Sequence, residues 1–259
     1  MAFLKFKLKT STAIYLIATT VITTYATSTL AQINQCTAES GATITPVVEL
    51  YTSEGCSSCP PADKWASSLK DKGFVVQAFH VGYWDYIGWV DRFAAPANTV
   101  RQREVAQKNK LRNIYTPQAV LNGQDWPQWS AGNSLANGGE AARAHVVLTQ
   151  RGLNQFEANV TRLPVLPAAT SWSAYWTITE HGHNSRVQAG ENAGEFLKHD
   201  FVVRQYTQAG EYKTAGNTPQ KLIFNSIPST PGHLRQVNLV IFDTKSGHTL
   251  QAVSLQCAG

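Results

Sequence analysis

The sequence predicts an α/β domain followed by a smaller, sandwich-like antiparallel β-rich domain. Between residues 47 and 152, apolar segments typical of strands alternate with helical patterns, which is the order expected of an α/β unit. Beyond Arg151, short strand-like segments are separated by Gly, Pro, Asn and Ser, which favours an antiparallel sandwich. The 259 residues, 43% of them hydrophobic, suffice for one large or two modest cores. We expect the first domain over residues 32–160 and the second over residues 161–259.

The elements of the first domain follow from apolar runs and helix-start signals. Pro60 and Pro61 fit the first turn of a helix, where their missing N–H groups are not needed. The pair Asn122-Gly123 is a turn signal that closes a strand. We predict strands over residues 47–51, 74–80 and 119–121, and helices over about 60–71 and 98–110.

The elements of the second domain are all predicted to be strands, separated by turn-forming residues. The linker between the domains is expected near residues 163–169, because two prolines there oppose regular structure. The predicted strands cover residues 155–161, 172–181, 201–206, 221–225, 237–243 and 250–256.

The first 31 residues have the pattern of an export signal peptide. Lysines precede a mostly apolar run, and Thr29-Leu30-Ala31 offers small residues where a signal peptidase cleaves. The alternative is an uncleaved membrane anchor, but threonines interrupt the apolar stretch, and spanning needs about 20 predominantly apolar residues. We expect cleavage before Gln32, an exported protein that is periplasmic or secreted, and no stable membrane association afterwards.

The basic charge belongs partly to this signal. Removing Lys5, Lys7 and Lys9 lowers the Lys+Arg count from 22 to 19, against 17 Asp+Glu. The mature chain has no glycine-rich phosphate loop and no concentrated basic patch. We therefore expect no nucleic-acid partner and no nucleotide site.

Two cysteines three positions apart, Cys56 and Cys59, lie where a predicted strand gives way to a helix. Residues i and i+3 are neighbours on a helix, and the unpaired N–H groups of the first turn stabilise a thiolate. This is typical of a thioredoxin-like redox site, with Cys56 as nucleophile and Cys59 as resolving thiol. The alternative, half of a zinc site, needs a second cysteine pair or histidines at ligand spacing, and none follows nearby.

The remaining cysteines, Cys36 and Cys257, stand near the two ends of the mature chain. An even number of cysteines in an exported protein favours disulfides, so we predict a structural Cys36–Cys257 bond that ties the ends together. The alternative is two free buried thiols, which an oxidising compartment disfavours.

Pro117 precedes the apolar strand that ends in Asn122-Gly123. In thioredoxin-like folds such a proline is cis and faces the disulfide. The backbone of Thr116 would then offer an edge on which a partner chain pairs during mixed-disulfide formation. We assign Thr116 and Pro117 to the catalytic site; the alternative is an ordinary strand-initiating proline.

An aromatic segment follows the strand that ends at His80. Its density of aromatic residues suggests a loop that folds over the cysteine pair and contacts substrate. The candidate substrate-binding residues are His80, Tyr83, Trp84 and Asp85. His80 would carry a proton or bind a metal, and Asp85 would tune the thiols. The alternative is that the histidine and the aromatic side chains belong to the core.

The densest polar motif of the second domain is the stretch 190–194, followed by His199 and Asp200. With His181 and His183, which would share one face of a strand, it is a candidate ligand or metal corner. The alternative is a glycine-bounded turn whose side chains satisfy backbone groups.

Four segments, in order, resemble the secreted thioredoxin-like family labelled domain of unknown function 1223: residues 48–63, 79–89, 115–118 and 190–204. The resemblance covers nearly all of the mature chain. It implies a thioredoxin-like domain with an added C-terminal β-rich part and no established activity.

Several positions depart from related patterns. Gly82 stands where the family usually has aspartate, and Val90 where it usually has lysine. Leu50 replaces the buried carboxylate that thioredoxin has six positions before its first cysteine. Glu49, one position earlier, points to the opposite strand face, where we expect it to pair with a lysine or arginine.

The first functional hypothesis is a thiol-disulfide oxidoreductase that acts on protein thiols or disulfides and needs no cofactor and no metal. The second is a periplasmic copper-delivery or assembly module using Cys56, Cys59 and His80. The third is a non-catalytic binding scaffold in which the disulfide locks the helix. The sequence leaves the partner, the direction of electron flow and the oligomeric state open.

Overall fold

The computed structural model describes residues 1–2, 36–131, 139–162, 171–213 and 219–257. The predicted signal peptide, apart from its first two residues, and the expected linker lie outside the described residues. Residues 35–259 form a single compact unit, to which the following description applies. No helix among the described residues has the length and apolar character needed to cross a membrane.

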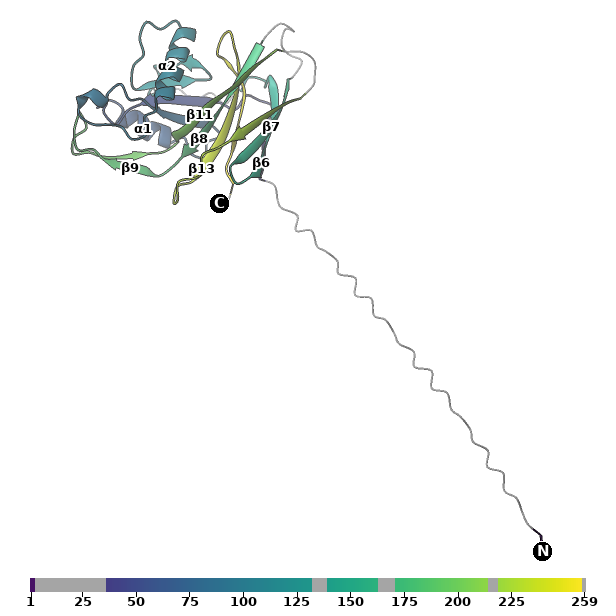
Figure 1. The fold of residues 1–259 in the computed structure, drawn as a ribbon. Helices are drawn as coiled ribbons and strands as arrows, with labels where there is room; N and C mark the ends of the chain where they lie inside the picture. Colours follow the sequence, from purple (N-terminus) through teal and green to yellow (C-terminus); the bar gives the residue numbers. More distant parts are fainter. Residues whose placement is uncertain (3–35, 132–138, 163–170, 214–218, 258–259) are drawn as a thin grey trace. The chain divides into compact units, whose positions relative to one another are not determined.

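The largest sheet has eight strands in the order β14-β13-β8-β11-β3-β2-β4-β5 (Figure 1). Strands from the predicted first domain make up one end of it, and strands from the predicted second domain make up the other. The first group is β2 (Val47–Thr52), β3 (Val75–His80), β4 (Gln118–Leu121) and β5 (Gln124–Asp125). The second group is β8 (Ser171–Glu180), β11 (Val202–Lys213), β13 (Arg235–Asp243) and β14 (Thr249–Leu255).

The two groups of strands meet where β11 lies beside β3. The contact is parallel, with Val202 opposite Ala78, and the Ala78 N–H donates a 2.8 Å hydrogen bond to the Phe201 carbonyl. On its other edge β3 pairs with β2 in parallel, and β2 pairs with β4 in antiparallel orientation. All pairs on the far side of β11 are antiparallel.

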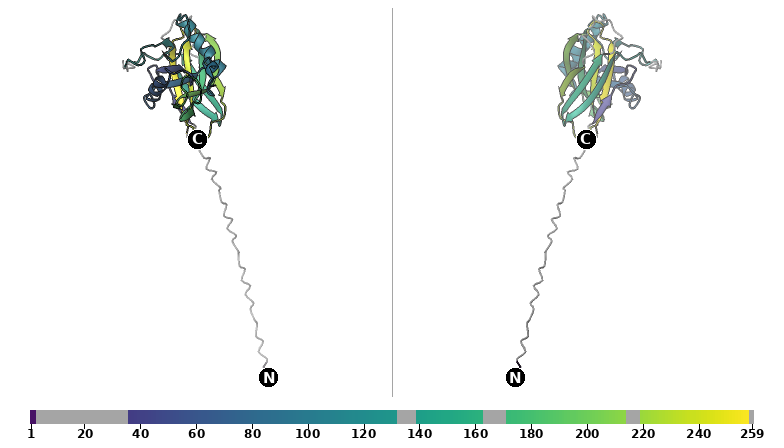
Figure 2. Two further views of the ribbon diagram at one scale, coloured as in Figure 1. Left: turned by 90° about the vertical axis from the view of Figure 1, so that its left-hand side faces the viewer. Right: turned by 90° about the vertical axis from the view of Figure 1, so that its right-hand side faces the viewer.

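A four-stranded sheet, in the order β1-β6-β7-β12, packs against the β8, β13 and β14 end of the large sheet (Figure 2). Trp172, Trp176 and Phe224 lie in the core between the two sheets, because alternate residues of each strand point inward. A separate pair, β9 (His183–Arg186) and β10 (Phe196–His199), lies in the loop between β8 and β11. The strands of the small sheet are β1 (Thr37–Glu39), β6 (Ala144–Gly152), β7 (Gln155–Arg162) and β12 (Gln220–Asn225).

Helices α1 (Pro60–Ser67) and α2 (Pro96–Lys108) contact side chains that point to opposite faces of β2. Val48 and Leu50 pack with α1, whereas Tyr51 packs with Val105 of α2, as the two-residue period of a strand requires. Both helices begin with proline in their first turn. Figure 1 shows them at the opposite end of the unit from β6 and β7. A short 3₁₀ helix, η1 (Asp85–Ile87), follows β3.

The predicted fold class, an α/β thioredoxin-like domain followed by a smaller antiparallel sandwich, is wrong. The fold is mostly β, with three sheets and two α-helices in the described part of the chain. The sequence indicated most strands and both helices correctly, but not their pairing. The second-domain strands do not form a separate sandwich, because β11 pairs with the free edge of β3. They extend the sheet that contains β2 and β3; these strands are β8, β11, β13 and β14.

The predicted bond between the chain ends is confirmed. Cys36 and Cys257 form a disulfide with a Cα–Cα distance of 5.8 Å and a sequence separation of 221 residues. Both side chains pack against the core between the sheets. The bond therefore joins the segment before β1 to the segment after β14.

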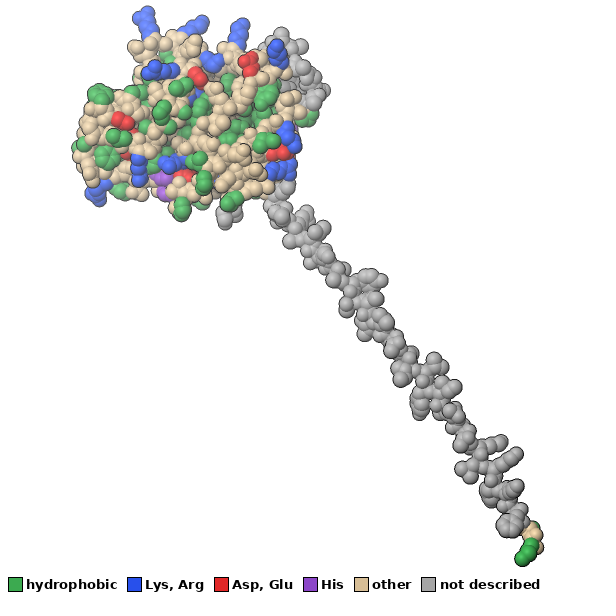
Figure 3. Space-filling view, viewed as in Figure 1, with side chains coloured by type: hydrophobic (Ala, Val, Ile, Leu, Met, Phe, Trp, Pro, Cys, Tyr) green, Lys and Arg blue, Asp and Glu red, His purple; other side chains and the backbone are tan. Residues whose placement is uncertain are grey.

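Several Lys and Arg side chains project along the upper edge of the unit in Figure 3, and others are scattered over the same face among polar, acidic and apolar side chains.

Candidate functional site

Cys56 and Cys59 form a disulfide directly before α1. Cys59 is the N-cap residue of the helix, and Pro60 and Pro61 fill its first turn. Only 1% of the surface of Cys56 and 0% of that of Cys59 is exposed. The Ser58 hydroxyl lies 3.4 Å from Cys56 Sγ and can donate a hydrogen bond to it. The disulfide is thus at the start of a helix, but it is covered.

Residues 82–91, hereafter the covering segment, pack against the chain beside the disulfide. A Cβ atom on Gly55 would lie 2.9 Å from Trp84 Cβ and 3.5 Å from Ile87 Cδ1. Glycine at position 55 therefore permits a contact that a larger residue would obstruct. At its other side, Trp84 donates a 2.7 Å hydrogen bond from Nε1 to Thr116 Oγ1. The covering segment thus connects the cysteine loop to the residue before Pro117.

The polar motif at residues 190–194 holds the cysteine loop by its backbone. Asn192 Nδ2 donates to the carbonyl of Glu54 at 2.8 Å and to that of Cys56 at 3.0 Å. The Ser57 N–H donates to Glu191 Oε2 at 3.0 Å, and hydrogen bonds from Ser57 lower the pKa of Glu191. This agrees with the alternative that the motif is a turn satisfying backbone groups, and the groups it satisfies belong to the candidate site.

Glu54, two positions before Cys56, is buried. His199 Nε2 lies 3.0 Å from its Oε1, and Trp89 Nε1 donates to its Oε2 at 2.7 Å. Burial raises the pKa of Glu54, but the hydrogen bonds from His199 and Trp89 outweigh it, so that the pKa lies below its ordinary value. The Glu54 carboxylate is therefore ionised, and both of its oxygens accept hydrogen bonds.

His80 and Asp91 form a second buried pair, with His80 Nδ1 2.7 Å from Asp91 Oδ2. Burial lowers the pKa of His80, but the Asp91 carboxylate outweighs it and brings the pKa above 6.5. Burial raises the pKa of Asp91, but His80 and two backbone N–H donors bring it below 3.8. The His80 and His199 rings meet edge to face, with centroids 4.9 Å apart. His80 Nε2 and His199 Nδ1 are buried without a hydrogen-bond partner.

Asp63 links this cluster to the disulfide. It lies on α1 one turn after Cys59, and its N–H donates a 3.1 Å hydrogen bond to the Cys59 carbonyl. Burial raises the pKa of Asp63 above 3.8, while the charges of His80 and His199 act in the opposite direction. The raised pKa means that Asp63 holds its proton up to a higher pH than an ordinary aspartate does.

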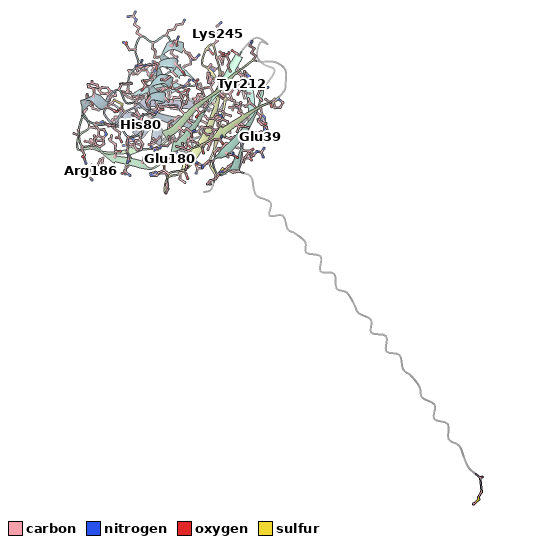
Figure 4. The ribbon with its side chains drawn as sticks, viewed as in Figure 1. Glu39, His80, Glu180, Arg186, Tyr212 and Lys245 are labelled. Atoms are coloured by element: carbon pink, nitrogen blue, oxygen red, sulfur yellow. A yellow bond between two sulfur atoms is a disulfide. The ribbon has the colours of Figure 1, made fainter. Side chains whose placement is uncertain are left out.

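The structure brings most of the predicted site residues together. Trp84 contacts Gly55 and bonds to Thr116, and the Thr116–Pro117 peptide bond is cis, as predicted. Tyr83 is half-buried and packs with the core cluster next to α2. Asp85 accepts a 3.2 Å hydrogen bond from the Asp91 N–H, and desolvation raises its pKa. His80 lies inside the unit and exposes 1% of its surface, so it does not reach a substrate in this conformation (Figure 4).

Other expectations on the histidines are corrected. His181 and His183 do not share a strand, because Gly182 between them has φ +74° and separates β8 from β9. His181 Nδ1 lies 3.5 Å from Asp200 Oδ1, whereas His183 Nε2 lies 3.0 Å from Glu180 Oε2. They therefore belong to separate polar groups.

Gly82 and Val90, the two positions that depart from the family pattern, have different surroundings. A Cβ on Gly82 would lie 3.2 Å from Asp85 Oδ2, so an aspartate at position 82 would bring a second carboxylate beside Asp85. Val90 exposes 70% of its surface, so a lysine there would extend into solvent.

Metal ligation requires several side chains that converge. Among the residues that the structure describes, no group of three or more His, Cys, Asp or Glu is arranged to hold a metal ion. In this form Cys56 Sγ and Cys59 Sγ are bonded to each other.

Sequence reasoning did not assign Asp63, Asp91 or Asn192 to the site. Asp63 carried a usable signal, because it stands four positions after Cys59 and so on the same helix face. Asp91 and Asn192 reach the site through tertiary contacts with Glu54. The sequence singled out the polar stretch that contains Asn192, but no local pattern places it beside the cysteine pair.

Fold and site together define a β-rich protein with a buried disulfide at a helix start, backed by buried histidine–carboxylate pairs. The chain belongs to the family described as "Protein of unknown function (DUF1223)", whose sequence model matches residues 47–242. This match confirms the family membership that the four sequence motifs indicated.

Two solved structures share the fold. Protein AGR_C_4864 from Agrobacterium tumefaciens superposes with a TM-score of 0.62 at 21% identity, over 83% of this chain and 95% of that one. HBP35 of Porphyromonas gingivalis superposes with a TM-score of 0.56 at 14% identity, over 83% of this chain and 76% of that one. No curated protein matches the chain.

Proposed function

We propose that the protein is an exported thiol-disulfide oxidoreductase that uses Cys56 and Cys59 on protein thiols or disulfides. The observation that carries the proposal is the disulfide at the start of α1, with the buried acid Asp63 one helical turn away. Export is supported by the signal-like first 31 residues and by the two disulfides, which persist in oxidising compartments.

The reaction on the oxidised protein begins with a substrate thiolate that attacks Cys56 Sγ. The Cys56–Cys59 bond breaks, a mixed disulfide forms on Cys56, and the electron pair leaves on Cys59 Sγ, which takes up a proton. A second substrate thiolate then attacks the substrate sulfur, which releases Cys56 as a thiolate. Two electrons pass from substrate to protein, and the reverse sequence reduces a substrate disulfide.

The surroundings of the cysteines suit both half-reactions. The partial positive charge of the α1 N-terminus and the Ser58 hydroxyl stabilise a thiolate on Cys56. Asp63, with its raised pKa, provides a proton for the departing Cys59 and takes it back when the disulfide re-forms. The ionised carboxylate of Glu54 accepts hydrogen bonds from His199 and Trp89, so its charge is partly compensated.

Attack on the disulfide requires a movement that exposes Cys56. Cys56 exposes only 1% of its surface, and in-line attack on a sulfur needs an open path to it. Trp84 Nε1 donates a hydrogen bond to Thr116, and Tyr86 exposes 82% of its surface, whereas Trp89 and Asp91 are bound to Glu54. We therefore assign to residues 84–87 of the covering segment the role of opening for substrate and closing on the free enzyme.

A redox titration tests the proposal. Mature protein is equilibrated in glutathione buffers, its thiols are alkylated, and each cysteine pair is counted by peptide mass, with Cys36–Cys257 as the internal control. We expect a reversible two-electron transition of Cys56–Cys59 between about −120 and −270 mV. The Cys59→Ser variant, in which Cys56 is a free thiol, should accumulate a mixed disulfide with a disulfide-bonded peptide, and Cys56→Ser should not. A pair that stays oxidised below about −300 mV would overturn the proposal.

A further inference from the structure

A cavity of about 360 Å³ opens beside Phe93, separate from the disulfide. Its walls come from the segment after the covering segment, from β9, from β11 and from the loop before β13. None of its seven lining residues is acidic, and four are Arg92, Arg204, His183 and His233. A polar cavity of this size lined by cationic and imidazole groups is suited to a small anionic ligand or an anionic head group.

Arg204 is the central cation of this cavity. Its guanidinium lies over the Phe93 ring, 5.4 Å from the centroid, which orients it without consuming its N–H donors. Arg204 Nε is buried and lies 3.4 Å from Glu180 Oε2, so this side of the guanidinium faces the carboxylate and not the cavity. An arginine has five N–H donors, and those on its two Nη atoms are the ones that a ligand in the cavity can accept from.

Glu180 does not neutralise the cavity from within. It is fully buried, does not line the cavity, and is already engaged by the Thr230 N–H at 2.9 Å and by His183 Nε2 at 3.0 Å. Burial raises the pKa of Glu180, but the hydrogen bonds from Thr230 and His183 and the charge of Arg204 outweigh it, so the carboxylate is ionised. Glu180 thus fixes His183 and Arg204 from behind.

The other cavity groups are anchored in the same way. His233 Nδ1 donates to the His181 carbonyl at 2.7 Å, and the His233 ring stacks on His183 with centroids 3.8 Å apart. Arg92 Nη2 donates to the Asn184 carbonyl at 2.6 Å, and its guanidinium lies 4.6 Å from the Phe93 centroid. Two guanidinium groups thus share one aromatic ring, and each keeps donors free for a ligand.

We propose that this cavity is a binding site for an oxyanion, either free or as the carboxylate or phosphate group of a larger ligand. Arg204 and Arg92 supply the charge and the paired N–H donors that match such oxygens, and the stacked histidines close the wall. The site is distinct from the cysteine pair and does not depend on the proposed redox activity.

Calorimetric titration of the mature protein with inorganic phosphate tests this site, with succinate in a parallel arm and chloride at matched ionic strength as the control. We expect saturable binding of at least one oxyanion and none of chloride; the tighter arm identifies phosphate or carboxylate as the ligand group. Arg204→Gln should weaken binding about tenfold or more, because charge-assisted hydrogen bonds are lost.

Arg186→Gln is the matched control variant, because Arg186 is exposed and does not line the cavity. Its guanidinium lies 6.0 Å from the centroid of the Phe196 ring, and Figure 4 shows it away from Glu180. It should bind as the wild type does. If Arg204→Gln fails to fold, Arg92→Gln on the exposed rim replaces it and should also weaken binding. The proposal is overturned if neither oxyanion binds saturably, or if both cavity variants bind like Arg186→Gln.

Discussion

Arg101 of α2 grips the carboxylate of Glu49 on β2 with two hydrogen bonds, from Nη2 to Oε1 at 2.7 Å and from Nε to Oε2 at 3.2 Å. Both residues are buried, and the hydroxyls of Tyr51 and Tyr175 also donate to the carboxylate. Burial raises the pKa of Glu49, but Arg101 outweighs it, and the pKa falls below its ordinary value. This buried ion pair connects α2 to β2 of the large sheet.

Removing one partner of this pair should be strongly destabilising. Arg101→Met leaves Glu49 as an uncompensated buried charge, and we expect a loss of about 3–5 kcal/mol in the free energy of unfolding, measured by urea denaturation. Arg103→Met, at an exposed arginine on the same helix, is the control. The double variant Glu49→Gln, Arg101→Met should recover part of the loss. Equal stability of the two single variants would contradict this assignment.

Gly55→Ala should speed reduction of the Cys56–Cys59 disulfide. The added Cβ would lie 2.9 Å from Trp84 Cβ and push the covering segment outward. We expect the rate of reduction by dithiothreitol, followed by alkylation and mass, to rise several-fold. Gly41→Ala is the control, since a Cβ there meets nothing within 4 Å. An unchanged rate in Gly55→Ala would show that the covering segment does not limit access.

Replacing both Cys36 and Cys257 by serine should lower stability without affecting the other cysteine pair. The two cysteines are 221 positions apart in the sequence. For a loop of that length the chain-entropy model gives a stabilisation of the folded state of about 5 kcal/mol. Urea denaturation of the double variant measures the loss. The redox titration of Cys56–Cys59 should stay the same; a changed potential would mean that the two bonds are coupled.

The His80–Asp91 pair should give stability a defined dependence on pH. The contribution of His80, whose folded pKa is raised, is present in full below 6.5 and is lost as pH rises through that folded pKa. The contribution of Asp91, whose folded pKa is lowered, is present above 3.8 and is lost as pH falls through the folded pKa. Together they predict a plateau between these two values.

Thermal unfolding of the wild type and of His80→Gln across this range measures the effect. The difference in stability should be largest between pH 3.8 and 6.5 and should shrink above it. His145→Gln is the control, because His145 pairs with the exposed Glu39, and exposed pairs contribute little. A difference that grows above pH 6.5 would refute the assigned shifts.

Local patterns sufficed for much of the secondary structure. Strand β2, helix α1 and strand β13 lie within a few residues of their predictions, because their apolar runs and Pro60 are local signals. The sequence analysis did not predict β6 or β9 as strands. Pairing was not predictable either: the alignment of Val202 with Ala78 depends on contacts between distant parts of the chain.

Two features of the site could be predicted from local sequence. The three-residue spacing of Cys56 and Cys59 indicated the disulfide, and the alternation of side chains along a strand indicated that Glu49 points to the face where it pairs with a cation. The environment of the pair was beyond such reasoning. Asn192 and His199 arrive from a segment far along the chain, and only the folded sheet brings them to Glu54. Burial, which sets the pKa of Asp63, is likewise a property of the assembled fold.

The junction of β3 with β11 has a consequence for how the chain matures. During synthesis, Ala78 emerges long before Val202, so one edge of β3 stays without its partner until most of the chain has been made. An unpaired strand edge is a template for association with other chains. A nascent chain that stops short of β11 is thus expected to be a client of chaperones and prone to aggregate, whereas the completed chain seals that edge itself.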